Sequence, residues 1–554
     1  MKRAAAIDPA PGADLRRRGG APSLALGVAM VGAALSWAFS GGPPLIGVDD
    51  AAITRAYAEN IAGGHGYVYN IGGERVEGST SALWTFALAA IYALFARPEI
   101  PILAAAFAAT VWSIHSALSI TRLLAERLKA RVEVATAVAA VGLSGLFGFF
   151  FWSVWSMMEL ALWSAALLWL TLCVVRKVEG ERVGDGALIA AAVILPLIRP
   201  EGVAVAGGLL ALGALLALRE RRAFLGGLAA AAASFAFVTG LRLLYFGQPL
   251  PNTFYAKVSS DRLQDVADGL QYLASFVLNA PFAELFLLSW VLAALWAAWS
   301  LARGARPGAA GLGVAAACAF GVLGMYAGLG GDHFALWRFY QPIAPLLPIP
   351  VALLLAKVAP EIAPRLARSP RLALAAAAAL FWLGVGAAHI HQNRFDLLKE
   401  FALVRQGVAF GEMLDTVEPR PRLGVVPAGG VALAYDGEIL DLMGLNWTEM
   451  AHANPVKTGP RNHASFDRSV FWGRPPDLIG RFNKPCAEGD WIEPAAREGA
   501  LDGLLVEPRF QAEFRPVRIH GAQACWTGFA REDWLVRVDD PRIEPVAWTE
   551  LTLL

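Results

Sequence analysis

The sequence predicts an α-helical polytopic membrane protein that carries a soluble α/β domain at its C-terminus. The 554-residue chain is 56% hydrophobic and only 17% charged, whereas soluble proteins carry about 25% charged residues. It contains 18 Trp and 55 Gly; Trp gathers at membrane interfaces and Gly is common in membrane helices. The formal net charge is only +1, and no basic stretch with interleaved aromatic residues occurs, so the sequence indicates a bilayer and no nucleic acid as partner.

The chain begins with a basic tail, residues 1–20, which includes Lys2, Arg3 and the arginines at 16–18. The apolar stretch 21–39 that follows is long enough to cross a bilayer. It is also longer than the apolar core of a cleaved signal peptide. We therefore expect an uncleaved first span, with the basic tail in the cytoplasm.

Ten further apolar stretches predict that the membrane domain extends over residues 21–390. They are 102–123, 132–152, 159–176, 186–198, 202–218, 224–245, 281–302, 309–329, 339–357 and 371–389. Segment 82–96 is also apolar but short. If it does not cross, the basic linkers between the other stretches all fall on the cytoplasmic side, as the positive-inside rule requires. We therefore expect eleven spans, a re-entrant or juxtamembrane helix at 82–96, and a C-terminus outside.

Residues 391–554 differ in composition from the preceding segments. Charged residues, prolines and short β-like runs at 423–426 and 504–506 predict a soluble α/β domain outside the membrane. Cys486 and Cys525 would then lie in an oxidising compartment, where a disulfide can form; two unpaired thiols are the alternative.

An acidic pair, Asp49 and Asp50, stands in the first outer loop, residues 41–81. The helical spacing of apolar residues after it indicates a helix on the membrane surface over 51–63. Either aspartate could cap that helix. One residue suffices for a cap, so the second aspartate needs another explanation.

Further polar residues gather in turns that the topology places on the same outer face. They are Arg55, Glu77, Glu159, Arg199, Glu201, Asn252, Lys257, Asp332, His333 and Arg338. Such a face supports group transfer from a lipid-linked donor: Arg55, Lys257 and Arg338 would hold a phosphate, and a carboxylate would accept the proton of an attacking hydroxyl. The sequence lacks phosphate-binding loop, dinucleotide and zinc motifs. The sequence leaves open whether Asp49 and Asp50 bind a divalent cation.

The motifs at 49–58, 64–70 and 74–81 resemble the first loop of GT-C fold glycosyltransferases. In particular, they are similar to the terminal β-(1→2)-arabinofuranosyltransferases of mycobacterial cell walls and to related flagellar-motor-control membrane proteins of Gram-negative bacteria. The resemblance implies a bacterial inner-membrane enzyme with a periplasmic C-terminal domain. It would transfer arabinofuranose from a polyprenyl-phosphate donor to a cell-envelope glycan with inversion. Asp49 would be the catalytic base and Asp50 its electrostatic or metal-binding neighbour.

Two other classes of function remain open from the sequence. The protein could be a non-enzymatic membrane scaffold, since some of the proteins it resembles are linked to motility. It could also be a transporter, although transporters more often place ionisable groups near the bilayer midplane, where these helices are nearly free of charge. For the enzyme, we expect the C-terminal domain to bind the glycan acceptor.

Overall fold

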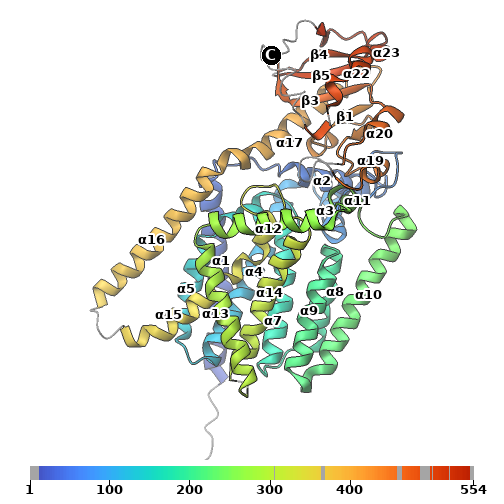
Figure 1. The fold of residues 1–554 in the computed structure, drawn as a ribbon. Coiled ribbons are helices and arrows are strands. Elements are labelled where there is room, and N and C mark those ends of the chain that lie inside the picture. Colours follow the sequence, from blue (N-terminus) through green and yellow to red (C-terminus); the bar gives the residue numbers. More distant parts are fainter. Residues whose placement is uncertain are drawn as a thin grey trace, which may run out of the picture.

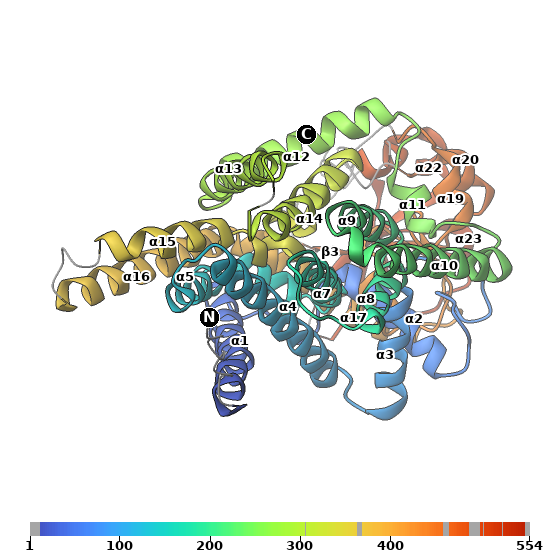
Figure 2. The same ribbon diagram turned by 90° about the horizontal axis from the view of Figure 1, so that it is seen from below.

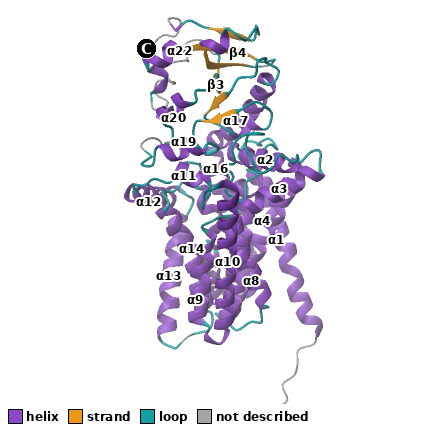
Figure 3. Cartoon of the chain, turned by 90° about the vertical axis from the view of Figure 1, so that its right-hand side faces the viewer, coloured by secondary structure: helices purple, strands orange, loops and turns teal. Residues whose placement is uncertain are grey.

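The computed structural model describes residues 11–304, 306–362, 368–457, 465–486, 499–501, 503–522 and 524–548. Lys2 and Arg3 of the predicted basic tail lie outside this part of the chain. A bundle of long helices carries a smaller domain at one end (Figure 1). Strands occur in that smaller domain, and the bundle is helical (Figure 3).

Each of the predicted spans coincides with one helix or with two or three consecutive helical segments. The bundle consists of α1 (Pro11–Phe39), α4 (Glu99–Arg127), α5 (Val132–Ser144), α6 (Phe147–Phe150), η1 (Phe151–Trp155), α7 (Leu160–Val178), α8 (Asp185–Ile198), α9 (Gly202–Leu216), α10 (Arg221–Phe246), α13 (Ala283–Ala302), α14 (Ala309–Gly328), η3 (Arg338–Leu346), α15 (Ile349–Ile362) and α16 (Arg368–Gln392). Within the described residues, eight helical segments are long and apolar enough to cross a membrane, and the pair Val132–Ser144 and Phe147–Trp155, bent by 64° at the break between them, would make nine. The shorter α8 and α9 lie alongside these helices (Figure 1).

Burial separates inner helices from outer ones. In α7, 78% of the apolar window is buried, whereas in α16 only 11% is. Seen along the bundle, α7 lies among α4, α8, α9 and α14, while α15 and α16 project to one side (Figure 2). The side chains of α7 pack against neighbouring helices on all sides of the helix. The exposed apolar residues of the outer helices suit a lipid environment.

Four shorter helices lie at the end of the bundle that faces the smaller domain: α2 (Asp49–Ala62), α3 (Ala82–Leu94), α11 (Asn252–Lys257) and α12 (Arg262–Asn279) (Figure 1). The helix predicted over 51–63 is therefore present as α2, and segment 82–96 forms the short α3. The capping interpretation of the aspartates is wrong. Val48 occupies the N-cap position, and no side chain caps the helix. Both aspartates are inside its first turn, where a negative charge interacts favourably with the helix dipole.

The C-terminal domain begins with α17 (Arg394–Leu414) and contains one six-stranded sheet in the order β2-β1-β3-β5-β4-β6. The strands are β1 (Leu423–Val425), β2 (Ile439–Asp441), β3 (Leu478–Pro485), β4 (Phe514–His520), β5 (Cys525–Arg531) and β6 (Ile543–Pro545), and the short helices include α18 (Gly429–Ala432), α19 (Thr448–Ala453) and α20 (Arg468–Gly473). The pairs of β1 with β2 and β3 are parallel, and the others are antiparallel. The predicted strand at 423–426 is confirmed, but residues 504–506 form a 3-10 turn. Cys486 and Cys525 form a disulfide.

The first loop shares its hydrophobic core with the C-terminal domain. Buried Tyr57, Tyr67 and Tyr69 of the loop pack in one cluster with Val431 and Ile439 of that domain. The loop therefore joins the bundle and the C-terminal domain through buried apolar area, which is the dominant stabilising contribution in protein interiors.

Candidate active site

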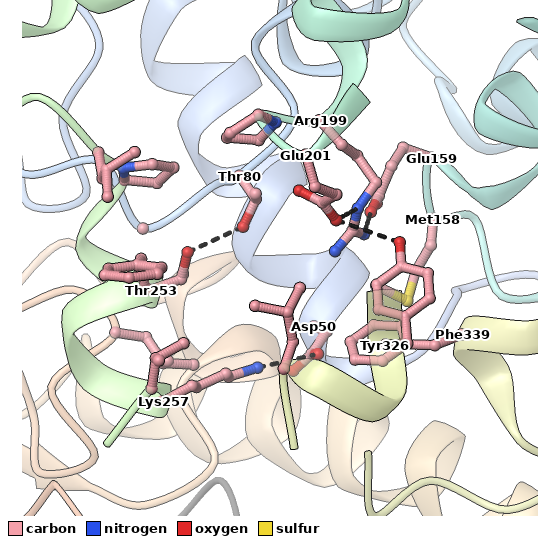
Figure 4. A pocket seen from close by; sticks show the side chains of 18 of the residues that line it. Asp50, Thr80, Met158, Glu159, Arg199, Glu201, Thr253, Lys257, Tyr326 and Phe339 are labelled. Carbon is pink, nitrogen blue, oxygen red and sulfur yellow. Dashed lines mark hydrogen bonds and ion pairs between the residues drawn. The ribbon is translucent and has the colours of Figure 1, made fainter. Parts of the chain in front are cut away.

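A cavity of about 360 Å³ lies between the bundle and the C-terminal domain, since residues of α2, α11 and α14 line it together with Leu445 of the C-terminal domain. Its polar lining includes Asp50 of α2, Glu159 before α7, Arg199 and Glu201 between α8 and α9, Thr80, Thr253, Lys257 of α11 and Tyr326 of α14 (Figure 4). Arg338 of η3 also lines it. Its apolar lining includes Leu160, Val203, Phe235, Phe254, Leu329 and Phe339. The cavity is therefore amphipathic, with charged groups and apolar walls in one space.

The first charged group in the cavity is built around Asp50. Nη1 of Arg338 donates to Oδ2 of Asp50 at 2.9 Å, and Nζ of Lys257 lies 3.9 Å from the same oxygen. Arg338 also donates to both carboxylate oxygens of Asp332, at 2.7 and 3.2 Å. Burial alone would raise the pKa of Asp50, but the charges of Lys257 and Arg338 outweigh it and hold the pKa well below its usual range. Asp50 is therefore an ionised carboxylate at neutral pH.

The second charged group consists of one arginine between two glutamates. Nη1 of Arg199 donates to Oε1 of Glu159 at 2.5 Å, and its Nε donates to Oε1 of Glu201 at 2.6 Å (Figure 4). The Tyr326 hydroxyl also donates to Oε1 of Glu201, at 3.1 Å. The Arg199 guanidinium lies over the ring of Phe339, 5.4 Å from its centroid. With one cation and two carboxylates, this group is acceptor-rich.

Asp49 lies beside Asp50 in the chain but outside the cavity lining. Its side chain is buried, and its two oxygens accept the backbone N–H groups of Gly429 (3.0 Å) and Gly430 (2.9 Å) at the start of α18. Burial raises the pKa of Asp49 to about 6, although the two N–H groups act in the opposite direction. The structure thus places Asp50, and not Asp49, where a substrate can reach it.

Six of the predicted site residues line the cavity: Asp50, Glu159, Arg199, Glu201, Lys257 and Arg338. Asp332 is buried behind Arg338, and Nδ1 of His333 lies 3.7 Å from its carboxylate.

The remaining predicted residues hold the surrounding loops together. Arg55 donates to Glu99, to the Tyr92 hydroxyl and to a backbone carbonyl. Glu77 accepts two bonds from Arg242, at 2.7 and 3.1 Å. The amide of Asn252 donates to the carbonyls of Gly444 and Leu445, at 2.7 and 3.1 Å. These three residues support the site but do not line it.

Several residues at the site were not singled out from the sequence. Arg242, near the end of an apolar segment, could have been flagged, because a charge there needs a partner. Tyr326 and Phe339 gave no signal, since aromatic residues are common in such helices. Burial, followed by the charges of Asp50 and Asp49, raises the pKa of Glu400 in α17 to about 8; no motif surrounds it in the sequence. Among the described residues, no group of three or more His, Cys, Asp or Glu side chains is arranged to hold a metal ion.

Comparison with known proteins identifies the fold from solved structures. No protein-family model and no curated protein sequence matches the chain. Among solved structures, ArnT from Cupriavidus metallidurans bound to undecaprenyl phosphate is 15% identical, with a TM-score of 0.50 over 78% of this chain and 88% of that chain. The same protein in the apo state gives 14% identity and a TM-score of 0.49 over 83% and 92% of the two chains. The Archaeoglobus fulgidus oligosaccharyltransferase gives 13% and 0.46 over 94% and 75%.

These findings define the class of the fold. The chain is a polytopic membrane protein with the GT-C fold and a C-terminal domain built on a small sheet. At 15% identity the likeness to ArnT concerns the fold, so a function has to be argued from the site.

Proposed function

We propose that the protein is an inverting glycosyltransferase that moves a sugar from a polyprenyl-phosphate donor to a glycan acceptor, with Asp50 as the general base. One observation carries the proposal: an ionised carboxylate, a neighbouring lysine and an acceptor-rich group line one cavity together with apolar walls. Lipid-linked sugars have the matching parts, namely a hydroxyl-rich head, an anionic link and an apolar tail. The ArnT structure, with undecaprenyl phosphate bound, supports a lipid donor of this kind.

Lys257 is the cation that we assign to the donor phosphate. Its ammonium lies 3.9 Å from Asp50, which is too far for a strong hydrogen bond, and its side chain is 24% exposed. It can therefore turn toward a phosphate. Arg338 has a different role, because its donors already contact Asp50 and Asp332. The apolar residues Val203, Phe235 and Leu329 offer a surface to the first isoprene units.

Glu159, Arg199 and Glu201 form the part of the cavity that suits the sugar. Burial alone would raise the pKa of Glu201, but the Arg199 charge outweighs it and keeps the pKa below its ordinary value. Ionised carboxylates accept hydrogen bonds from sugar hydroxyls. The excess of one negative charge also disfavours an acidic sugar. We therefore propose a sugar without an acidic group, and the sequence resemblance nominates arabinofuranose.

The proposed reaction has one displacement at the anomeric carbon. When Lys257 turns to the donor phosphate, it leaves Asp50, whose carboxylate then becomes a better base. Asp50 takes the proton of the acceptor hydroxyl as its oxygen forms a bond to the anomeric carbon. The bond from that carbon to the phosphate oxygen breaks, and its electron pair leaves with polyprenyl phosphate, which Lys257 neutralises. Attack opposite to the leaving group inverts the anomeric centre.

We propose that the cavity and the C-terminal domain lie on the periplasmic side of a bacterial inner membrane. The disulfide between Cys486 and Cys525 supports an oxidising compartment. The loops that carry Arg182, Arg219 and Arg303 follow α7, α9 and α13 at the opposite end of the bundle (Figure 1), as the positive-inside rule requires of a cytoplasmic face. The C-terminal domain, which covers the cavity, is the proposed acceptor-binding part.

The test is transfer by the purified full chain in lipid nanodiscs. Synthetic polyprenyl-phosphate donors that carry arabinofuranose, a neutral hexose or a uronic acid are each incubated with an envelope glycan, with and without a chelator. We expect release of polyprenyl phosphate and extension of the glycan with a neutral donor, and at least 10-fold less with the acidic one. Absence of release with every donor would refute the proposed activity. A non-enzymatic scaffold or a transporter predicts that absence.

A further inference from the structure

The aspartate outside the cavity has buried contacts that suggest a role of its own. We propose that Asp49 is a positioning residue: it fastens the C-terminal domain to α2 and thereby fixes Asp50 against Lys257 and Arg338. The functional part of this inference depends on the proposed role of Asp50 as the base. The contact itself is independent of any activity.

The contact between Asp49 and α18 leaves no room for side chains. Each carboxylate oxygen of Asp49 accepts one backbone N–H, from Gly429 and Gly430. A Cβ at Gly429 would lie 1.9 Å from the backbone oxygen of Asp49, and a Cβ at Gly430 would lie 2.5 Å from the backbone oxygen of Val404 in α17. The two glycines are therefore required because α18 is held between α2 and α17. Any other residue would separate these helices.

Other bonds join the same two parts of the chain around this contact. The Tyr69 hydroxyl donates to the carbonyl of Ala428 at 2.5 Å. The side chain of Asn70 exchanges two bonds of 2.9 Å with the backbone of Ile439 in β2. The Tyr57 hydroxyl donates to Asn446 at 3.1 Å. Asp49 is thus a charged member of a buried interface between the first loop and the C-terminal domain.

That interface forms a wall of the cavity. Leu445 of the C-terminal domain lines the cavity, and Asn252, at the start of α11, donates to the Leu445 carbonyl. Lys257 stands at the end of the same short helix. Docking of the C-terminal domain therefore affects the surface of the cavity, while Lys257 stays on a helix with an anchor of its own, the bonds of Asn252 to the carbonyls of Gly444 and Leu445.

Asp49 controls Asp50 because the two residues share the first turn of α2. Successive residues in an α-helix point about 100° apart, so one carboxylate reaches α18 while the other reaches the cavity. The turn is further held by the Val48 N–H, which donates to the Ser156 carbonyl at 3.2 Å. If the first turn shifts, the 2.9 Å bond between Asp50 and Arg338 is lost. A displacement of about 1 Å can lower a rate about 100-fold.

The test changes the contact from both sides and reads it without relying on transfer. Asp49→Asn removes the charge from α2, and Gly429→Ala forces α18 away from it. Gly473→Ala is the matched control, since a Cβ at Gly473 meets nothing within 4 Å. Two measurements on the full chain report the result: hydrogen exchange of the Gly429 and Gly430 amides, and labelling of Asp50 by a carbodiimide and an amine.

We expect both Asp49→Asn and Gly429→Ala to accelerate exchange of these amides at least 10-fold and to raise Asp50 labelling at least 3-fold, with Gly473→Ala unchanged. Transfer should show a 10- to 100-fold lower kcat and a donor KM within 3-fold of the wild-type value. Unchanged exchange, or faster exchange with unchanged Asp50 labelling and unchanged kcat, would overturn the inference. If labelling rises but the wild-type protein transfers no sugar, the proposed function fails and the positioning of Asp50 by Asp49 stands.

Discussion

Replacement of Asp50 by asparagine separates chemistry from folding at this site. Asn has nearly the same shape, and its amide oxygen can still accept the bond that Arg338 Nη1 makes at 2.9 Å. Arg338 also keeps its two bonds to Asp332. A charge-assisted hydrogen bond becomes a neutral one, which costs about 1 kcal/mol. We therefore expect Asp50→Asn to fold and to melt within a few degrees of the wild-type protein.

The effect on transfer should be much larger. A general base contributes about 100- to 10,000-fold to a rate, which corresponds to about 2.7–5.5 kcal/mol of activation free energy. The assay is single-turnover release of polyprenyl phosphate from a bound donor, so that product release does not limit the rate. Asp467→Asn serves as the control, because it removes one half-buried aspartate charge at the N-cap of α20, a helix that contributes no residue to the cavity lining, and asparagine caps a helix about as well as aspartate.

A specific result would refute the assignment of Asp50. If Asp50→Asn keeps more than about one tenth of the wild-type single-turnover rate, its carboxylate is not the general base, since even the weakest general bases contribute about 100-fold. A normal rate combined with a large loss of thermal stability would identify Asp50 as a structural partner of Arg338 instead. A large loss of rate in Asp467→Asn would show that the assay does not report the site.

Three further predictions concern the surrounding charges. Lys257→Met should raise the donor KM about 10- to 100-fold, because a charge-assisted bond to the phosphate is worth about 1.5–3 kcal/mol. Lys257→Arg keeps the positive charge and should retain most of the donor affinity. Titration of each variant with the donor measures both effects. Arg242→Met should lower the free energy of unfolding by about 3–5 kcal/mol, since it leaves buried Glu77 without its bidentate partner. The double variant Glu77→Met with Arg242→Met should recover much of the melting temperature. A double variant whose loss equals the sum of the two single losses would contradict this. Glu400→Gln should not change stability at pH 4 but should stabilise the protein at pH 9. The pKa of Glu400 is raised to about 8, so the stability that its protonated form contributes is fully present below about pH 4.5 and is lost as the pH rises through 8. The glutamine variant does not titrate and keeps this stability. Melting curves at pH 4 and pH 9 test the prediction.

The membrane domain could be predicted because its signals are local. A stretch of about 20 apolar residues has few alternatives to a membrane helix, and basic linkers specify which ends share a side. The predicted stretches therefore coincide with the helices of the bundle, including the short pair α8 and α9. Segment 82–96 forms the 13-residue helix α3, and its position outside the set of spans stays a prediction from its length and from the basic linkers. In the C-terminal domain, where strands are short, residues 504–506 were predicted as β-like and form a 3-10 turn.

Composition and local pattern were enough to predict the membrane class, the position of the helices and a set of site residues, six of which line the cavity. Which aspartate faces the cavity depends on the packing of distant segments. Asp49 and Asp50 are adjacent and chemically identical, and their difference depends on α18, whose glycines lie about 380 residues away. The same holds for Glu400, whose pKa is raised by burial and by carboxylates brought near it by folding. Sequence pattern reports the periodicity of one segment, whereas the direction that a side chain faces depends on the segments packed against it.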